Sequence, residues 1–209
     1  IALGVASIVL PLRHPAHVAK AAASADVLSG GRLILGVASG DRHEEYPALN
    51  MTYDDRGERF QDSFDYLQRM WDEAPEFANS YGNPSGDMDM LPKPLSGKLP
   101  LLVTGGSQQD PEWIARHGDG WITYPRPIET QAKIIEGWRN RVKAAGEPAK
   151  PAVQSLYVDL VAEADAPPRP IHLGFRSGTK YLREHLHSLQ EIGINHVALN
   201  LRFNQTDIE

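Results

Sequence analysis

Residues 1–40 have the sequence IALGVASIVLPLRHPAHVAKAAASADVLSGGRLILGVASG, and this stretch decides the fold. Residues 1–10 form an apolar run rich in β-branched side chains, which is typical of a buried strand and too short to cross a membrane. Residues 32–39 form a second apolar run of the same kind. We therefore predict a strand in each run.

The segment between the two runs predicts a helix. Pro15 suits the first helical turn, where the N–H that proline lacks would have no partner within the helix. Apolar side chains then recur at helical spacing at Val18, Ala21, Ala22, Ala25 and Leu28. Gly30 and Gly31 are placed to end the helix. Two buried strands joined by a helix form a βαβ unit, so we expect parallel strands and a right-handed crossover.

Length and composition exclude several classes of protein. The chain has 209 residues and a net charge of −6, which favours a domain with a sizeable core and argues against a nucleic-acid binder. It has no cysteine, which excludes a disulfide framework, a thiolate metal site and a cysteine nucleophile. It also lacks an apolar run of about 18 residues, so we expect no membrane span.

The rest of the chain continues the alternation of strands and helices. Further strands are predicted at residues 99–104, 121–124, 154–162 and 196–201. Further helices are predicted from Asp55 or Gly57 to Trp71, at residues 111–117 and 129–145, and from Ser177 or Thr179 to Ile192. We expect the helix that ends at Trp71 to bury Phe60, Phe64 and Leu67 as core.

Two segments have the composition of loops. Residues 72–100 are rich in proline, glycine and serine and predict a long excursion, with a short hairpin around residues 77–89. Residues 164–170 predict a proline-rich linker. Residues 207–209 have the pattern of a helix start.

Strands that alternate with helices predict an α/β fold with a parallel sheet. An open doubly wound sheet is the alternative, but no G-x-G-x-x-G follows the first strand and no P-loop is present. We therefore favour a (β/α)8 barrel, which has about 250 residues. A shorter chain of this kind contains only part of such a barrel.

The first βαβ unit also resembles the bacterial luciferase-like family of flavin-dependent oxidoreductases. The resemblance is carried by GVASIVLPLRHP, which begins at Gly4, and by LSGGRLILGVASG, which begins at Leu28. In that family these runs are barrel strands three and four. The resemblance implies one luciferase-like TIM-barrel domain over residues 1–209, seen from about strand three to strand eight, without the first two βα units and cut at its C-terminal end.

The clearest candidate for an anion site is the run VTGGSQQDPEW at residues 103–113. A strand ends there in two glycines and a serine before a helix begins, with Asp110 placed as its N-cap and Pro111 at its first position. Glycine lets a backbone approach a phosphate closely, and a helix N-terminus offers unpaired N–H groups. A tight turn uses the same residues for geometry alone, so both interpretations stay open.

The resemblance places the flavin phosphate at this turn. It implies contacts from Gly105, Gly106, Ser107 and Gln108, with Gln109 as a further candidate. It also implies a cofactor-binding role for Ser39, Gly40 and Asp41, which end the second strand. The luciferases have a phosphate-binding arginine at the position of Ser39. We expect Arg42 or Arg59 to replace it, with a mobile surface arginine as the alternative.

The end of the first strand is the expected place of the flavin ring. In the luciferase-like family small residues here let the isoalloxazine ring pack against the strand, often beside a non-prolyl cis peptide. The resemblance assigns this place to Ala6 and Ser7, with the cis bond between them. The alternative is a pair of small residues in a tightly packed barrel.

The histidines show neither H-x-x-x-H nor H-E-x-x-H spacing, so we expect no metal site. His43 lies in a strand-end loop and is the one histidine that we consider as a catalytic candidate. The carboxylates of Asp41, Glu44 and Glu45 would suit a glycosidase, but surface carboxylates are usually just solvated. Trp121, Thr123 and Tyr124 either line a substrate cavity or fill the barrel.

The resemblance implies a flavin-dependent monooxygenase or oxidoreductase that uses reduced FMN and O2 on a small organic substrate. One alternative is a deazaflavin-dependent enzyme that transfers a hydride without oxygen, and another is a flavin-binding barrel without turnover. We further expect a cytoplasmic homodimer served by a separate flavin reductase, with no nucleic-acid or membrane partner.

Overall fold

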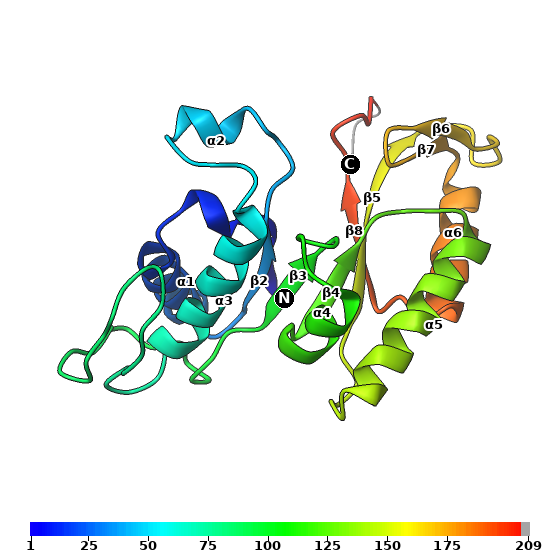
Figure 1. The fold of residues 1–209 in the computed structure, drawn as a ribbon. Coiled ribbons are helices and arrows are strands. Elements are labelled where there is room, and N and C mark those ends of the chain that lie inside the picture. Colours follow the sequence, from blue (N-terminus) through cyan, green and yellow to red (C-terminus); the bar gives the residue numbers. More distant parts are fainter. Residues whose placement is uncertain (206–209) are drawn as a thin grey trace. The chain divides into compact units, whose positions relative to one another are not determined.

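The computed structural model describes residues 1–205, in which helices and strands alternate along the chain (Figure 1). The chain divides into two compact units, Ile1–Asp110 and Pro111–Glu209, here called the N-terminal and C-terminal units. The predicted helix start at residues 207–209 lies outside the described residues. The α/β class predicted from the sequence is confirmed.

The N-terminal unit contains three parallel strands. Its elements are β1 (Leu3–Val9), the 3-10 helix η1 (Leu10–Leu12), α1 (Pro15–Ser29), β2 (Leu33–Ala38), α2 (Glu45–Ala48), α3 (Arg56–Met70) and β3 (Leu101–Thr104). β2 pairs in parallel with both β1 and β3. The predicted βαβ unit is therefore confirmed.

The ends of α1 follow the sequence signals. Pro15 is its first residue, and Nδ1 of His14 accepts a hydrogen bond from the N–H of Ala16 at 3.3 Å. Gly30 ends the helix with a φ of 71°, a left-handed conformation that glycine adopts without the steric cost of a Cβ.

The side chain of Asp26 connects the C-terminal end of α1 to two neighbouring segments. Its side chain is 1% exposed. Oδ1 accepts the N–H of Leu33 at 3.2 Å, and Oδ2 accepts the N–H of Leu95 at 2.9 Å. One buried carboxylate therefore joins α1 to β2 and to the segment that precedes β3.

The inner face of α3 is the aromatic stripe that the sequence predicted. Phe60, Phe64 and Leu67 are buried, and Trp71 is buried directly after the helix. The Nε1–H of Trp71 donates to the carbonyl oxygen of Ala19 at 3.2 Å, so α3 lies against α1. These aromatic side chains form core, as expected.

Residues 71–100 fold back on α3. Antiparallel bridges join Glu76 to Ser85 and Asn79 to Gly82, which confirms the short hairpin predicted in this segment. The ring of Phe77 lies 5.1 Å from the ring of Tyr66 on α3. The excursion is therefore anchored to the helix by apolar contact.

The C-terminal unit is built around β5. Its elements are α4 (Pro111–His117), β4 (Gly120–Thr123), α5 (Ile128–Ala144), β5 (Ala152–Leu160), β6 (Arg169–Ile171), β7 (Gly174–Ser177), α6 (Thr179–Glu191) and β8 (His196–Asn200). β5 pairs in parallel with β4, β7 and β8, and α6 packs against it (Figure 1).

The hairpin formed by β6 and β7 is a correction to the sequence analysis, which placed only a linker at residues 164–170. The two strands pair antiparallel, with Arg169 opposite Arg176 and Ile171 opposite Gly174. Gly174 makes the pairing with β5 possible, because a Cβ on it would lie 1.8 Å from the carbonyl oxygen of Tyr157. Strands of three and four residues are too short to show an alternating pattern.

The inner face of α5 includes a polar side chain. The buried stripe is Gln131, Ile135, Trp138 and Val142, and Ile134 is only half-buried. Trp121 on β4 is half-buried, and its ring lies 5.6 Å from the ring of Trp138, so it packs against α5. A fully buried glutamine heads the stripe because the helical period, rather than hydrophobicity, decides which side chains face inward.

A half-buried histidine lies beside the core between β5 and α6. Leu156 and Val158 of β5 pack against Phe175 and Leu182. The ring of His185 on α6 lies 5.0 Å from the ring of Phe175. Burial lowers the pKa of His185, because the charged imidazolium loses hydration there.

We predict that Asp26→Ala lowers the free energy of unfolding by about 2–4 kcal/mol, because two buried N–H groups lose their acceptor. Urea denaturation measures the change. Asp65→Ala is the matched control, because Asp65 forms only an exposed ion pair with Arg69 and its loss changes stability by less than about 1 kcal/mol. Equal effects of the two substitutions would contradict the role of Asp26.

We predict that the free energy of unfolding falls as the pH drops below about 6.5, the ordinary pKa of histidine. The lowered pKa of His185 makes the unfolded chain take up the proton first, so acid favours unfolding until His185 is also protonated in the folded chain. His185→Phe should flatten this part of the pH profile. His187→Phe, at an exposed position of the same helix, should leave the profile unchanged.

Candidate functional site

The carboxyl ends of β1, β2 and β3 lie at one edge of the N-terminal unit, because the strands are parallel. Barrel enzymes of this topology place their chemistry at that edge. The predicted cofactor-binding residues lie on it: Ala6, Ser7, Ser39, Gly40, Asp41, Gly105, Gly106, Ser107 and Gln108.

A β-bulge shapes the end of β1. Val5 pairs with Leu35 and Ile8 pairs with Val37, so Ala6 and Ser7 together face the single residue Gly36. A Cβ on Gly36 would lie 2.4 Å from the carbonyl oxygen of Val5 and 2.5 Å from that of Ala6. The bulge therefore requires glycine at position 36.

The expected cis peptide between Ala6 and Ser7 is wrong. Among residues 1–205 the cis bond is Leu91–Pro92, and the Ala6–Ser7 bond is trans. The bulge bends the strand and accommodates the additional residue without a cis bond. Ala6 and Ser7 are both exposed in the N-terminal unit, so the alternative of a tightly packed pair is also not observed.

A chain of hydrogen bonds joins the three strand ends. The hydroxyl of Thr104 donates to the carbonyl oxygen of Ala6 at 2.7 Å. The hydroxyl of Ser107 donates to the carbonyl oxygen of Thr104 at 2.7 Å and accepts the N–H of Ser39 at 3.3 Å. The hydroxyl of Tyr46 in turn donates to the carbonyl oxygen of Ser39.

In this chain of hydrogen bonds, the hydroxyl proton of Ser107 is donated to a backbone carbonyl of the protein. The side chain of Ser107 is 8% exposed. Its hydroxyl holds β3 to β2, so the contribution of this turn to an anion comes from the backbone.

The backbone of residues 105–108, here called the 105–108 turn, has the geometry of an anion-binding concavity. Gly105, Ser107 and Gln108 have positive φ values of 60°, 45° and 58°. Within residues 1–205, the N–H groups of Gly106, Ser107 and Gln108 have no hydrogen-bond partner. The sign of φ alternates over Gly105, Gly106 and Ser107, and successive N–H groups in such a stretch converge on an anion. Gly106 is exposed, and a Cβ on it would meet no atom within 4 Å.

Gln109 braces the 105–108 turn. Its Nε2 donates to the carbonyl oxygen of Gly57 at 2.9 Å and to that of Ser107 at 3.1 Å. The turn is thereby fixed to the first turn of α3. This contact gives Gln109 a supporting role, and its phosphate contact stays a prediction.

The segment after β2 places the remaining predicted residues. Ser39 is buried, and Gly40 has a φ of 78°; a Cβ on Gly40 would lie 2.7 Å from a methyl carbon of Val9. Asp41 is exposed, and its carbonyl oxygen accepts the hydroxyl of Tyr53 at 3.4 Å. His43 is exposed, with its ring 5.0 Å from that of Tyr53.

The two arginines expected to replace the family's phosphate-binding arginine have other partners. Arg42 pairs with Glu45 at 3.2 Å on the surface. The guanidinium group of Arg59 donates to the carbonyl oxygen of Pro11 and lies 3.8 Å from a carboxylate oxygen of Asp55. Neither contact involves the 105–108 turn.

Tyr46 is a structural residue of the site that the sequence analysis missed. It is fully buried, and burial raises the pKa of its hydroxyl. Its hydrogen bond to Ser39 fixes the end of β2. The one sequence signal was an aromatic residue, one of two tyrosines in the polar segment after β2.

The described residues contain no group of three or more metal-ligating side chains that could hold a metal ion. Residues 1–205 also contain no helix that is long and apolar enough to cross a membrane.

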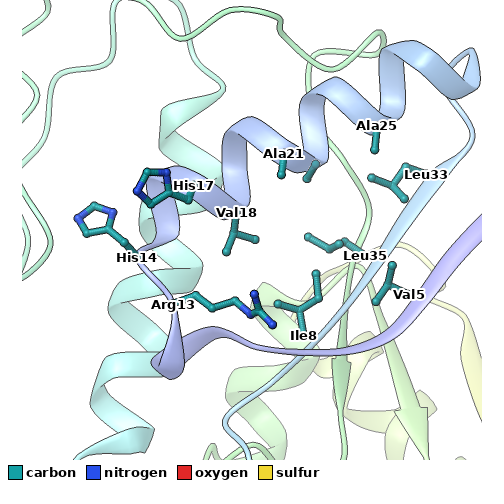
Figure 2. A pocket seen from close by; sticks show the side chains of 11 residues that line it. Val5, Ile8, Arg13, His14, His17, Val18, Ala21, Ala25, Leu33 and Leu35 are labelled. Atoms are coloured by element: carbon teal, nitrogen blue, oxygen red, sulfur yellow. The ribbon is translucent and has the colours of Figure 1, made fainter. Parts of the chain in front are cut away.

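The cavity between α1 and the β1–β2 pair is not this site. It has a volume of about 630 Å³ and an apolar lining that includes Val18, Ala21 and Leu35, with Arg13 and His17 at one end (Figure 2). It lies on the face of the strands that α1 covers, whereas the 105–108 turn follows the carboxyl end of β3.

A family model described as luciferase-like monooxygenase matches residues 1–167. The chain belongs to this family. Its members are flavin-dependent monooxygenases and oxidoreductases, and they include F420-dependent dehydrogenases.

Three curated relatives illustrate the range of the family. An uncharacterised protein of Mycobacterium tuberculosis is 28% identical over 162 residues, which cover 75% of this chain and 56% of the relative. The F420-dependent hydroxymycolic acid dehydrogenase of the same organism is 30% identical over 64% of this chain and 37% of the relative. The FMNH(2)-dependent dimethylsulfone monooxygenase of Pseudomonas putida is 25% identical over 73% of this chain and 43% of the relative. The chain thus spans about half the length of these relatives or less.

Solved structures with the same fold include both kinds of enzyme. An F420-dependent secondary alcohol dehydrogenase matches 95% of this chain and 73% of its own, with a TM-score of 0.78 and 16% identity. The EDTA monooxygenase from Chelativorans sp. BNC1 matches 96% of this chain and 69% of its own, with a TM-score of 0.76 and 13% identity. The fold is that of part of a luciferase-like TIM barrel, as the sequence predicted.

We predict that Ser107→Ala lowers the free energy of unfolding by about 1–3 kcal/mol, because the N–H of Ser39 loses its buried acceptor. Ser96→Ala is the matched control, since the Ser96 hydroxyl bonds the carbonyl oxygen of Lys98 at an exposed position. Chemical denaturation measures both. Unchanged stability of Ser107→Ala would contradict the structural role of this hydroxyl.

Proposed function

We propose that the N-terminal unit binds a phosphate-bearing flavin-type cofactor and that the 105–108 turn holds its phosphate. The observation that supports this proposal is the set of three unpaired N–H groups at Gly106, Ser107 and Gln108. The open space above Gly106 leaves room for an anion. The hydroxyl of Ser107 supports the turn from within, and the backbone makes the contact.

The same proposal places the cofactor ring at the bulge in β1. Ala6 and Ser7 are small and exposed, so a planar ring can lie against their backbone. The bond from Thr104 to the carbonyl oxygen of Ala6 holds this surface rigid. Ser39, Gly40 and Asp41 line the edge between the ring and the phosphate in this arrangement.

The reaction proposed first is monooxygenation of a small organic substrate with reduced FMN and O2. The bound cofactor supplies the redox chemistry, and the protein supplies orientation and protection from water. The residues of this chain act by binding and positioning: the turn fixes the phosphate, and the bulge fixes the ring. His43, beside Tyr53, is the candidate for holding a proton near the strand ends.

Hydride transfer with the deazaflavin F420 is the second candidate. It is supported by the relatives named as F420-dependent enzymes, among them the hydroxymycolic acid dehydrogenase and the glucose-6-phosphate dehydrogenase of Kineococcus radiotolerans. A phosphate at the 105–108 turn suits both cofactors. A flavin-binding barrel without turnover is the third candidate.

The proposal extends to the setting of the whole protein. We propose one luciferase-like domain over residues 1–209, a homodimer in the cytoplasm, and a separate flavin reductase as the partner of an FMN-dependent enzyme. The substrate proposed is a small molecule.

We predict that Gly106→Asp weakens cofactor binding at least about tenfold, because its carboxylate repels the phosphate. Gly106→Asn is the matched control, with the same shape and no charge. Both should keep wild-type stability within about 0.5 kcal/mol, since the added side chain enters open space. The measurement is a titration of the purified full-length protein with FMN and with F420, oxidised and reduced, followed by absorbance and fluorescence.

The outcomes separate the candidates. Tight FMN binding with substrate-dependent oxygen consumption supports the monooxygenase, and preference for F420 without oxygen consumption supports hydride transfer. Binding without turnover on any substrate supports the third candidate. Failure to bind either cofactor, or equal binding by Gly106→Asp and Gly106→Asn, contradicts the phosphate site.

A further inference from the structure

The start of α1 carries a group of basic side chains that the proposed cofactor site does not use. Arg13 and His14 directly precede the helix, and His17 lies in its first turn. All three residues are exposed, and they lie together at the end of the cavity where α1 begins (Figure 2). Positive charge is unfavourable at this end of a helix, because the unpaired N–H groups of the first turn already carry partial positive charge.

His14 caps α1 only while its imidazole is neutral. Its Nδ1 accepts the N–H of Ala16 at 3.3 Å. An imidazole nitrogen accepts a hydrogen bond only when it carries no proton, so the neutral ring of His14 has its proton on Nε2. In the imidazolium form both nitrogens carry protons and both are donors. Protonation of His14 therefore removes the cap.

The capping ring also contacts two other elements. Its centroid lies 5.9 Å from that of Tyr66 on α3 and 5.6 Å from that of Tyr81 in the hairpin of residues 76–85. Both tyrosine rings are nearly perpendicular to the imidazole, at 84° and 80°. Because the cap sets the orientation of the imidazole, the same hydrogen bond supports both ring contacts. His14 thus joins the start of α1 to α3 and to the hairpin.

The hairpin is held to α3 by its own contacts. The side-chain amide of Asn79 donates to the carbonyl oxygen of Asp62 at 3.0 Å, and the hydroxyl of Ser80 donates to the carboxylate of Asp62. The ring of Phe77 packs on Tyr66. These contacts do not involve His14, so a change at His14 acts on the first turn of α1.

The titratable groups around His14 do not compensate a positive charge on it. On its own side of the contact these groups are Arg13 and His17, whose ring lies 5.9 Å away. On the opposite side they are the phenols of Tyr66 and Tyr81, and burial raises the pKa of Tyr66, which keeps that phenol neutral in acid. Within residues 1–205, no carboxylate forms an ion pair with His14.

We propose that His14 is a pH-dependent latch between α1, α3 and the hairpin of residues 76–85. The neutral ring caps α1 and holds its first turn against the two tyrosines. Protonation in acid removes the cap, places a charge at the helix N-terminus and releases the first turn. Histidine changes its charge between about pH 5 and pH 8, so a moderate fall in pH operates such a latch. The released turn follows η1, which connects it to β1.

The first experiment determines which nitrogen of His14 carries the proton. It records the nitrogen-15 NMR spectrum of the histidine side chains in the full-length protein at about pH 8, where imidazole is neutral. The variant His14→Asn identifies the signals of His14. We expect the proton on Nε2, because Nδ1 accepts the N–H of Ala16. A proton on Nδ1 would contradict the cap and overturn the proposal.

The second experiment measures hydrogen exchange at the amides of Val18 and Ala19. In an α-helix these N–H groups bond to the carbonyl oxygens four residues earlier, at His14 and Pro15, so their exchange reports opening of the first turn. Protection factors remove the intrinsic effect of pH on exchange. We expect both protection factors to fall at least about fivefold between about pH 8 and about pH 5, because the cap is lost and a charge appears.

Two variants assign this effect to His14. His14→Asn supplies a cap that does not titrate, so its protection factors should change less than about twofold over the same pH range. His17→Asn is the matched control, because it removes an exposed imidazole from the same turn and leaves the cap in place. It should keep the pH dependence of the wild type. Circular dichroism checks that both variants are folded.

Two results of the exchange experiment would overturn the proposal. One is equal protection of Val18 and Ala19 at both pH values in the wild type. The other is a pH dependence in His14→Asn that equals that of the wild type. The inference is independent of the cofactor proposed for the N-terminal unit, because both experiments are made without cofactor.

Discussion

The close approach of β1 to Gly36 is the constraint on which the N-terminal unit depends. At the bulge, the carbonyl oxygens of Val5 and Ala6 occupy the space that a Cβ on Gly36 would need. This geometry directs the carbonyl of Ala6 to the hydroxyl of Thr104 on β3. The ends of three strands are thereby held relative to one another by the protein's own hydrogen bonds. The backbone geometry requires small residues at this edge of the sheet. Small residues also leave the edge accessible to a ligand.

The hydrogen bonds that follow from this constraint decide how the candidate site works. Ser107 joins β3 to β2, so its hydroxyl is committed to the protein. The N–H groups of Gly106, Ser107 and Gln108 have no partner among residues 1–205 and are available to the phosphate that we propose. Backbone N–H groups are fixed by the fold and need no side-chain ordering when a ligand binds, which favours preorganised binding. The family's phosphate-binding arginine is therefore not required for a phosphate site of this kind.

In the C-terminal unit, the two faces of one strand also have different roles. β5 presents leucine and valine to the core and tyrosine and aspartate to the other face. Asp159 neutralises Arg176 and anchors the segment after β8. A strand with period-two alternation thus supports a core and a charged surface at once.

The sequence by itself determined the features that depend on neighbouring residues. The βαβ order, the ends of α1 at Pro15 and Gly30, the buried stripe of α3 and the glycine turn after β3 all follow from local periodicity and turn chemistry. Only the tertiary structure decided the bulge at Ala6 and Ser7, the inward hydroxyl of Ser107 and the β6–β7 hairpin. The physical reason is that strand register and hydrogen-bond partners are set by residues far apart in the chain, such as Ala6 and Thr104, which are 98 positions apart. No local pattern contains that information.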